Sequence, residues 1–223
     1  MTDANSEDQE QQQQTDLATP TLGRKEHNLE DLGLVYYLSQ PTIMVNLVVI
    51  TMCWIASAFN FFMIGLQVKY FPGNFAHNML IMTSVDIPAC LLAGYLVPRF
   101  KAKSIFIAFF ALQTFAGLSI LFAVDSANPG WTFLISVALA KFGVQLTFTT
   151  VWMVHPKMFP TLFGATSMGI ANFVTRSIVI FAPLVAEIPY PLPMAVYTVV
   201  SLVAGFASLF LLEESKEPEE CLS

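Results

Sequence analysis

Three ionisable side chains lie deep inside long apolar stretches of this 223-residue chain, namely Asp86, Lys141 and Arg176. If these stretches cross a membrane, each charge costs about 2.5–3.5 kcal/mol to insert, so such residues usually face a cavity or a partner. Asn172 and Thr175 lie one helical turn before Arg176 and directly beside it. The chemistry that this pattern predicts is recognition of an ionic group, or pairing between the charges themselves.

Two interpretations stay open for each charge. Arg176 either contacts a ligand or pairs with Asp86, because both occupy the middle of their stretches, at equivalent places in two inverted three-helix repeats. For Asp86 the structural interpretation is favoured. Lys141 either faces a central cavity or reaches along its helix to Gln145.

Aromatic side chains accompany the charges. The segment Phe59-Asn-Phe-Phe62 is a candidate for a cavity wall, although large apolar side chains more often face lipid or another helix. His77 and His155 are predicted to lie in loops. The three histidines lack ligand spacing and the three cysteines are scattered, so no metal site, disulfide framework or cofactor is expected. The other aromatic candidates are Phe61, Phe142, Phe148, Trp152 and Phe173.

The elements that must position these residues are membrane-spanning helices. Apolar residues make up 55% of the chain and charged residues 12%, against roughly a quarter in soluble domains. A helix needs about 20 apolar residues to cross the hydrocarbon core. The sequence therefore predicts an all-α membrane protein with six transmembrane helices, at about 42–68, 75–97, 104–124, 131–154, 161–186 and 191–212.

The distribution of basic residues predicts the topology. With both tails in the cytoplasm, the inner segments hold seven Lys and Arg residues and the outer loops hold only Lys69, as the positive-inside rule requires. Residues 1–40 form an acidic, Gln-rich tail, in which Leu29–Leu38 is either a short surface helix or linker. Residues 41–212 form the transmembrane domain, and 213–223 a second acidic tail. The inner basic residues are Arg24, Lys25, Arg99, Lys101, Lys103, Lys157 and Lys216.

Four ordered passages between about Gln40 and Leu212 carry a family resemblance. They are Trp54-Ile-Ala-Ser57; Asp86-Ile-Pro-Ala89; Gly94-x-x-x-Pro98-Arg99-x-Lys101-x-Lys103; and Ala140-Lys-Phe142, followed by Met158-Phe-Pro-Thr161, Gly169, Arg176 and Pro183. On these motifs the chain resembles the C-terminal half, helices 7–12, of the organic cation/anion/carnitine transporter family of the major facilitator superfamily.

The resemblance implies a site and a function. It makes Arg176 the residue that attracts anionic or zwitterionic substrates, with Lys141, Phe59, Phe62 and Asn172 as further substrate contacts. It implies half of a secondary-active carrier of small organic ions, not an enzyme, and the carrier would work by alternating access. The chain would be a multi-pass membrane protein, with the plasma membrane as its expected location. Its partners would be the lipid bilayer, the substrate, and an N-terminal half, a second copy or a larger complex, with no nucleic acid.

Departures from the family pattern keep an alternative function open. Asp86, Arg99, Lys101 and Lys103 are the predicted structural and gating residues, yet Pro98 and Lys101 replace the acid and glycine of the family's basic loop. Nothing in the chain resembles the first six helices. The alternative is therefore a degenerate half-carrier that serves as an accessory subunit of a larger membrane complex.

Overall fold

A computed structural model describes residues 39–71, 74–124, 131–159 and 161–212. The chain divides into two units, Met1–Pro41 and Thr42–Ser223. Nearly all of the first unit and residues 213–223 lie outside the described residues, and so do both predicted tails and the segment Leu29–Leu38. The first described helix begins at Pro41, at the boundary between the two units.

The described residues form helices and no strands, and the prediction of an all-α membrane fold is confirmed. Six helical segments are long and apolar enough to cross a membrane, each with at most two charged residues in its apolar window. The helices are α2 (Pro41–Gln67) with the 3-10 turn η1 (Val68–Tyr70), α3 (Phe75–Ser84), α4 (Asp86–Leu96), α5 (Ala102–Val124), α6 (Trp131–Met158), α7 (Thr161–Val179), α8 (Ala182–Ala186), and α9 (Leu192–Ala207) with η2 (Ser208–Phe210).

The second and fifth spans are each broken into two helices. Val85 separates α3 from α4, and the break between α7 and α8 precedes Pro183. Proline lacks a backbone N–H and is tolerated in the first turn of a helix, which suits both Pro88 in α4 and Pro183 in α8. The first break places Asp86 in the first turn of α4, where the positive end of the helix dipole favours an acid.

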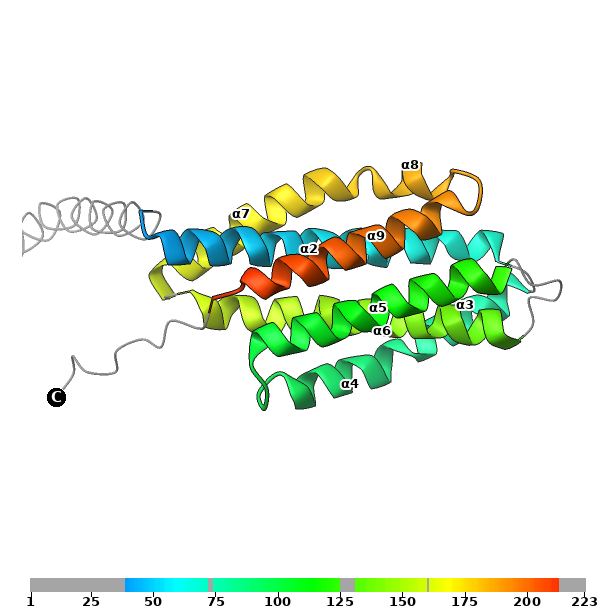
Figure 1. Cartoon of the computed structure of the whole chain (residues 1–223), viewed down its shortest axis with the longest axis horizontal. Coiled ribbons are helices and arrows are strands. Elements are labelled where there is room, and N and C mark those ends of the chain that lie inside the picture. Colours follow the sequence, from blue (N-terminus) through cyan, green and yellow to red (C-terminus); the bar gives the residue numbers. More distant parts are fainter. Residues whose placement is uncertain (1–38, 72–73, 125–130, 160, 213–223) are drawn as a thin grey trace, which may run out of the picture. The chain divides into compact units, whose positions relative to one another are not determined.

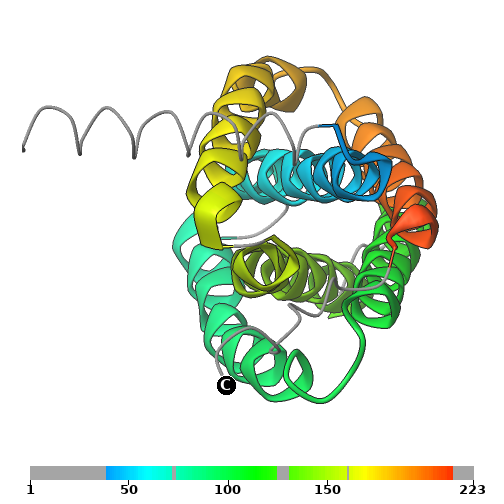
Figure 2. The same ribbon diagram turned by 90° about the vertical axis from the view of Figure 1, so that its left-hand side faces the viewer.

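Helices α2 and α6 lie in the middle of the bundle (Figure 2). On one side of them are α5 and α9, and on the other are the two broken spans, α3–α4 and α7–α8 (Figures 1 and 2). The candidate site lies on the side of α2 and α6 that faces the two broken spans.

A buried polar network joins four helices through Gln113 of α5. Its Nε2 donates to Thr147 Oγ1 at 2.7 Å and to the Gly143 carbonyl at 3.3 Å, both on α6. Its Oε1 accepts from Asn60 Nδ2 of α2 at 3.4 Å and from Ser201 Oγ of α9 at 3.3 Å. Asn60 also donates to Ser201 Oγ at 2.9 Å. Since an unpaired polar group in hydrocarbon is costly, this network specifies how the four helices fit together.

Glycines allow two close helix approaches around this network. A Cβ at Gly117 would lie 2.3 Å from Thr198 Oγ1, and a Cβ at Gly143 would lie 2.9 Å from Gln113 Cγ. Small residues at such crossings are a usual device of helix packing in membranes.

At the end of the bundle formed by η1 and the segment after α8, Glu187 accepts hydrogen bonds from Lys69 and Tyr70. The hydrogen bond from Lys69, and to a smaller extent that from Tyr70, lowers the pKa of Glu187 below its ordinary value. The contact ties the predicted first outer loop to the predicted third.

Candidate functional site

The centre of the candidate site is an ion pair between α4 and α6. Lys141 Nζ lies 3.4 Å from Asp86 Oδ1, and the two side chains are 8% and 26% exposed. The Lys141 ammonium also lies over the Phe61 ring of α2, 3.7 Å from its centroid. A cation on an aromatic face is attracted by the ring quadrupole, and more strongly where water is excluded. Side chains of three helices therefore surround one buried lysine.

This pairing corrects two predicted alternatives. The pair of Asp86 with Arg176 is wrong, because α4 packs against α6, which carries Lys141. The contact of Lys141 with Gln145 is wrong as well, since Lys141 turns toward α4 and Phe61. The equivalence of the two inverted repeats predicted that Asp86 and Arg176 lie at similar depth, but it did not predict which helices are neighbours.

Polar side chains extend the site along the α4–α6 seam. Gln145 Nε2 donates to Cys90 Sγ at 3.1 Å and to Thr149 Oγ1 at 3.4 Å. Cys90 is exposed, and Gln145 and Thr149 are partly exposed. These groups can still exchange their mutual hydrogen bonds for bonds to a polar ligand.

An aromatic row continues from the ion pair toward the end of α6. Phe61 stacks on Phe148 with a centroid separation of 5.2 Å, Phe148 meets Trp152 at 6.5 Å, and Trp152 meets Trp54 at 5.0 Å. Trp152 is 39% exposed, whereas Trp54 is buried. The row thus offers a partly open apolar wall directly beside the charges.

The structure separates the two phenylalanines predicted to line the cavity. Phe62 is 38% exposed and contacts Phe61 edge-on, with 5.7 Å between the ring centroids. Phe59 is 7% exposed and buried within the bundle. Phe61 is therefore the side chain of this segment that adjoins the ion pair, and Phe62 contacts Phe61.

Arg176 lies on α7 and is exposed, with the partly exposed Asn172 one turn before it. Among the described residues, no ion pair joins Arg176 to an acid. The neighbouring Thr175 is buried, and its hydroxyl has no hydrogen-bond partner there. Lys141 is thus buried, and Asp86 compensates its charge, whereas Arg176 is exposed and has no acid partner among the described residues.

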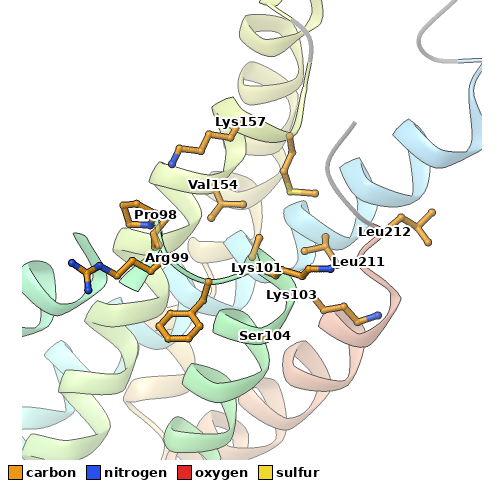
Figure 3. A pocket seen from close by; sticks show the side chains of 13 residues that line it. Pro98, Arg99, Lys101, Lys103, Ser104, Val154, Lys157, Leu211 and Leu212 are labelled. Atoms are coloured by element: carbon orange, nitrogen blue, oxygen red, sulfur yellow. The ribbon is translucent and has the colours of Figure 1, made fainter. Parts of the chain in front are cut away.

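The basic loop residues lie apart from the ion pair, at one end of the bundle. Arg99, Lys101 and Lys103 line a pocket of about 540 Å³, together with Lys157 from the end of α6 (Figure 3). Arg99 packs its guanidinium over the Tyr95 ring, 3.8 Å from the centroid, and donates to the Tyr95 hydroxyl.

The prediction that the two described histidines lie in loops is wrong. His77 lies in the first turn of α3. His155 is a fully buried residue of α6, whose Nε2 lies 3.1 Å from Ser167 Oγ of α7 and whose ring packs edge-on against Trp54. It fastens α7 to the end of α6. The span was predicted to end at residue 154, but α6 continues through Pro156 to Met158.

Six helices of the described residues are long and apolar enough to cross a membrane, and they define a polytopic membrane protein. Its middle helices carry the ion pair and the row of aromatic side chains. Sequence comparison supports this class. The chain is 28% identical to mouse organic anion transporter 3 over 208 residues, 29% identical to human solute carrier family 22 member 12 over 188, and 27% identical to an organic cation transporter-like protein of Drosophila melanogaster over 182.

These matches confirm the resemblance to the organic cation/anion/carnitine transporter family, solute carrier family 22, and to its C-terminal half. They cover 89%, 81% and 80% of the chain, respectively, and 36%, 33% and 32% of the relatives. The chain therefore spans about a third of the length of the curated relatives it matches. No family model matches the chain.

Proposed function

We propose that the chain is one six-helix half of a secondary-active carrier of small organic ions, with anions or zwitterions favoured. The observation that carries this proposal is the balance of charges in the described spans. Asp86 and Lys141 compensate each other at 3.4 Å, so Arg176 leaves a net positive charge on the membrane-embedded surface. A fixed positive charge in a medium of low dielectric constant attracts an anion strongly.

The division of labour between the two cations follows from their contacts. Arg176 is the primary contact for the anionic group, because it is exposed and has no acid partner among the described residues. Lys141 is a second contact, which an anion reaches by competing with Asp86. The aromatic row of Phe61, Phe148 and Trp152 supplies apolar area for the organic part of the substrate.

Alternating access requires a second half, which an N-terminal half in the same or a separate chain, a second copy or a larger complex would supply. In carriers of this kind the site lies near the bilayer midplane, between two repeats that rock against each other. The relatives, which are about three times as long, support the need for that second half.

The test is a comparison of Arg176→Asp with Arg176→Lys in the purified full chain. Ligand-induced thermal shifts would be measured with an aromatic carboxylate such as benzoate and with tetraethylammonium. Arg176→Asp should weaken carboxylate binding at least tenfold, about 1.4 kcal/mol, and favour the cation, because it changes the site by two unit charges. Arg176→Lys should keep most of the carboxylate binding. Equal binding of both probes by all three proteins would refute the assignment of Arg176.

A second candidate function has its own observation in its favour. Pro98 and Lys101 stand where the family's gating loop has an acid and a glycine, and Arg99 is engaged with Tyr95. This pattern suits an accessory subunit that keeps the fold without gating. Uptake of benzoate by proteoliposomes that contain only this chain would reject the accessory function, whereas binding without uptake would favour it.

A further inference from the structure

The side-chain amide of Gln145 lies in the seam between α4 and α6, and its hydrogen bonds in the protein are weak. Its Nε2 donates to Cys90 Sγ at 3.1 Å and to Thr149 Oγ1 at 3.4 Å. A thiol sulfur is a poor acceptor, and 3.4 Å exceeds the usual N–H···O range of about 2.7–3.2 Å. For comparison, the buried amide of Gln113 donates to Thr147 Oγ1 at 2.7 Å. A ligand oxygen is therefore a better acceptor for Gln145 than either of its present partners.

The contact between Gln145 and Cys90 is not needed to join α4 to α6. The ion pair of Asp86 with Lys141 already connects these helices at 3.4 Å. Cys90 and Gln145 each lie one helical turn beyond a member of that pair. An amide with weak partners, at a contact that a neighbouring ion pair secures, is available for recognition of a ligand.

Gln145 shares one face of α6 with the other members of the site. Lys141, Gln145, Phe148 and Trp152 follow one another at spacings of four, three and four residues, which places their side chains on the same face. Gln145 and Phe148 are half-buried and Trp152 is exposed, so a ligand can reach them. Along this face a paired cation is followed by a hydrogen-bonding amide and then by aromatic rings.

The spacing along this face sets the shape of a ligand that contacts both polar groups. Four residues of an α-helix rise by about 6 Å, which is the offset between Lys141 and Gln145 along the α6 axis. Phe61 of α2 borders the same stretch, because its ring lies 3.7 Å from Lys141 Nζ and stacks on Phe148. A benzoate ring that packs on Phe61, with its carboxylate toward Lys141, directs its para substituent along α6 toward Gln145.

We propose that Gln145 is a specificity-determining residue, which donates a hydrogen bond to an oxygen placed para to the carboxylate of an aromatic substrate. The inference rests on the proposed function, in which Lys141 is the second contact for the anion. It narrows the substrate class from organic anions to aromatic acids that carry a polar oxygen opposite the acid group. A site that hydrogen-bonds a substrate oxygen rejects the analogue without it, because the amide then loses its water and gains no partner.

The test measures apparent dissociation constants for the full chain in mild detergent with three benzoates. Para-hydroxybenzoate and para-methylbenzoate have nearly the same shape and differ in the hydrogen-bonding oxygen, and meta-hydroxybenzoate tests the spacing. The variant is Gln145→Met, which keeps the length of the side chain and removes its amide. Thr114→Val is the control, since Thr114 is a half-buried residue of α5 whose hydroxyl donates to the Phe110 carbonyl of its own helix.

We expect the parent chain to bind para-hydroxybenzoate about fivefold more tightly than para-methylbenzoate, the usual net effect of one hydrogen bond. The meta isomer should show less of this preference. Gln145→Met should bind the two para compounds equally, and Thr114→Val should keep the parent's ratio. A ratio of two ligands measured on one protein is insensitive to a general loss of folded material, so a structural role of Gln145 would not change it.

Three results would overturn the proposal alone. They are equal binding of the para compounds by the parent chain, with binding still sensitive to Arg176→Asp; an unchanged ratio in Gln145→Met; and tighter binding of the meta than of the para isomer. Absence of binding of all three benzoates would overturn the proposed function as well. Gln145→Asn, which withdraws the amide by one methylene group and should reduce the ratio, keeps the test decisive if Gln145→Met does not fold.

Discussion

Replacing Lys141 by methionine removes the cation of the ion pair and keeps a side chain of similar length. At the observed 3.4 Å and an effective dielectric constant of about 20, the gross attraction between Lys141 and Asp86 is about 5 kcal/mol. Desolvation offsets much of that gain, and the 26% exposure of Asp86 lets water screen the rest. The net loss of stability in Lys141→Met should therefore be about 2–3 kcal/mol, most of it from the acid that remains unpaired in the membrane.

A double-mutant cycle separates the pairing from other effects of each substitution. Asp86→Asn should destabilise through the unpaired lysine, and the double variant Asp86→Asn with Lys141→Met should recover about 1–3 kcal/mol of the summed losses. Thermal unfolding in detergent is the assay. For a domain of this size each kcal/mol corresponds to roughly 2–4 °C in Tm, so the single variants should differ from the parent chain measurably. Strictly additive losses would refute the ion pair.

Arg176→Asp belongs to the same experiment as a control for specificity. In the structure Asp86 already has its partner, so a second acid at position 176 should change neither the Asp86–Lys141 coupling nor the folded yield by more than a surface substitution does. A large fall in yield, rescued by a basic residue at position 86, would restore the pair of Asp86 with Arg176.

Four further outcomes are expected. Gly117→Ala should destabilise by about 1–3 kcal/mol, because its Cβ would lie 2.3 Å from Thr198 Oγ1, whereas Gly65→Ala, with nothing within 4 Å, should be neutral or slightly stabilising in the same unfolding assay. The lowered pKa of Glu187 means that its contact with Lys69 contributes stability above the carboxyl's ordinary pKa and loses it as the pH falls through the lower folded value; Tm measured against pH should show that loss, and Glu187→Gln should abolish it. Protease protection of terminal tags in sealed vesicles should place both termini on the same, cytoplasmic side; tags on opposite faces would mean an odd number of spans. Cross-linking in mild detergent should show a dimer or larger complex, and a thermally stable monomer would contradict the need for a second half.

The fold class could be predicted from the sequence because length and apolarity alone identify a membrane-spanning helix. Each of the six stretches falls in or above the range of about 17–25 residues that crosses the hydrocarbon core, and each contains few charges. The same reasoning put Asp86, Lys141 and Arg176 inside the membrane. Depth along a helix follows directly from position in the chain, so this part of the site was predictable.

Lateral contacts were not predictable in the same way. Gln113 is one of four polar residues in the span predicted at 104–124, yet its partners lie on three other helices, 53, 34 and 88 positions away in the chain. The partner of Asp86 likewise depends on α4 packing against α6. Hydrophobic periodicity gives little help here, because most of these helices are apolar on every face and no face is marked as interior.

The position of His155 could not be predicted from the residues next to it in the sequence. Proline at position 156 removes one backbone donor, and in a soluble protein that often marks the end of a helix. In α6 the helix continues for two residues beyond the proline, and His155 turns inward to Ser167 and Trp54. Packing between helices outweighed the local preference.

The exposure of Arg176 explains why the proposed function needs a second half. Most exposed side chains of the spans are large and apolar, such as Phe115 of α5, 66% exposed, and Phe173 of α7, 76% exposed, and these suit lipid. Arg176 on α7 is exposed without an acid partner among the described residues, and in lipid it would cost about 2.5–3.5 kcal/mol. A facing half that encloses water or an anion around Arg176 removes that cost. The residue that makes the isolated chain unfavourable in lipid is therefore the one that the proposed carrier uses to select its substrate.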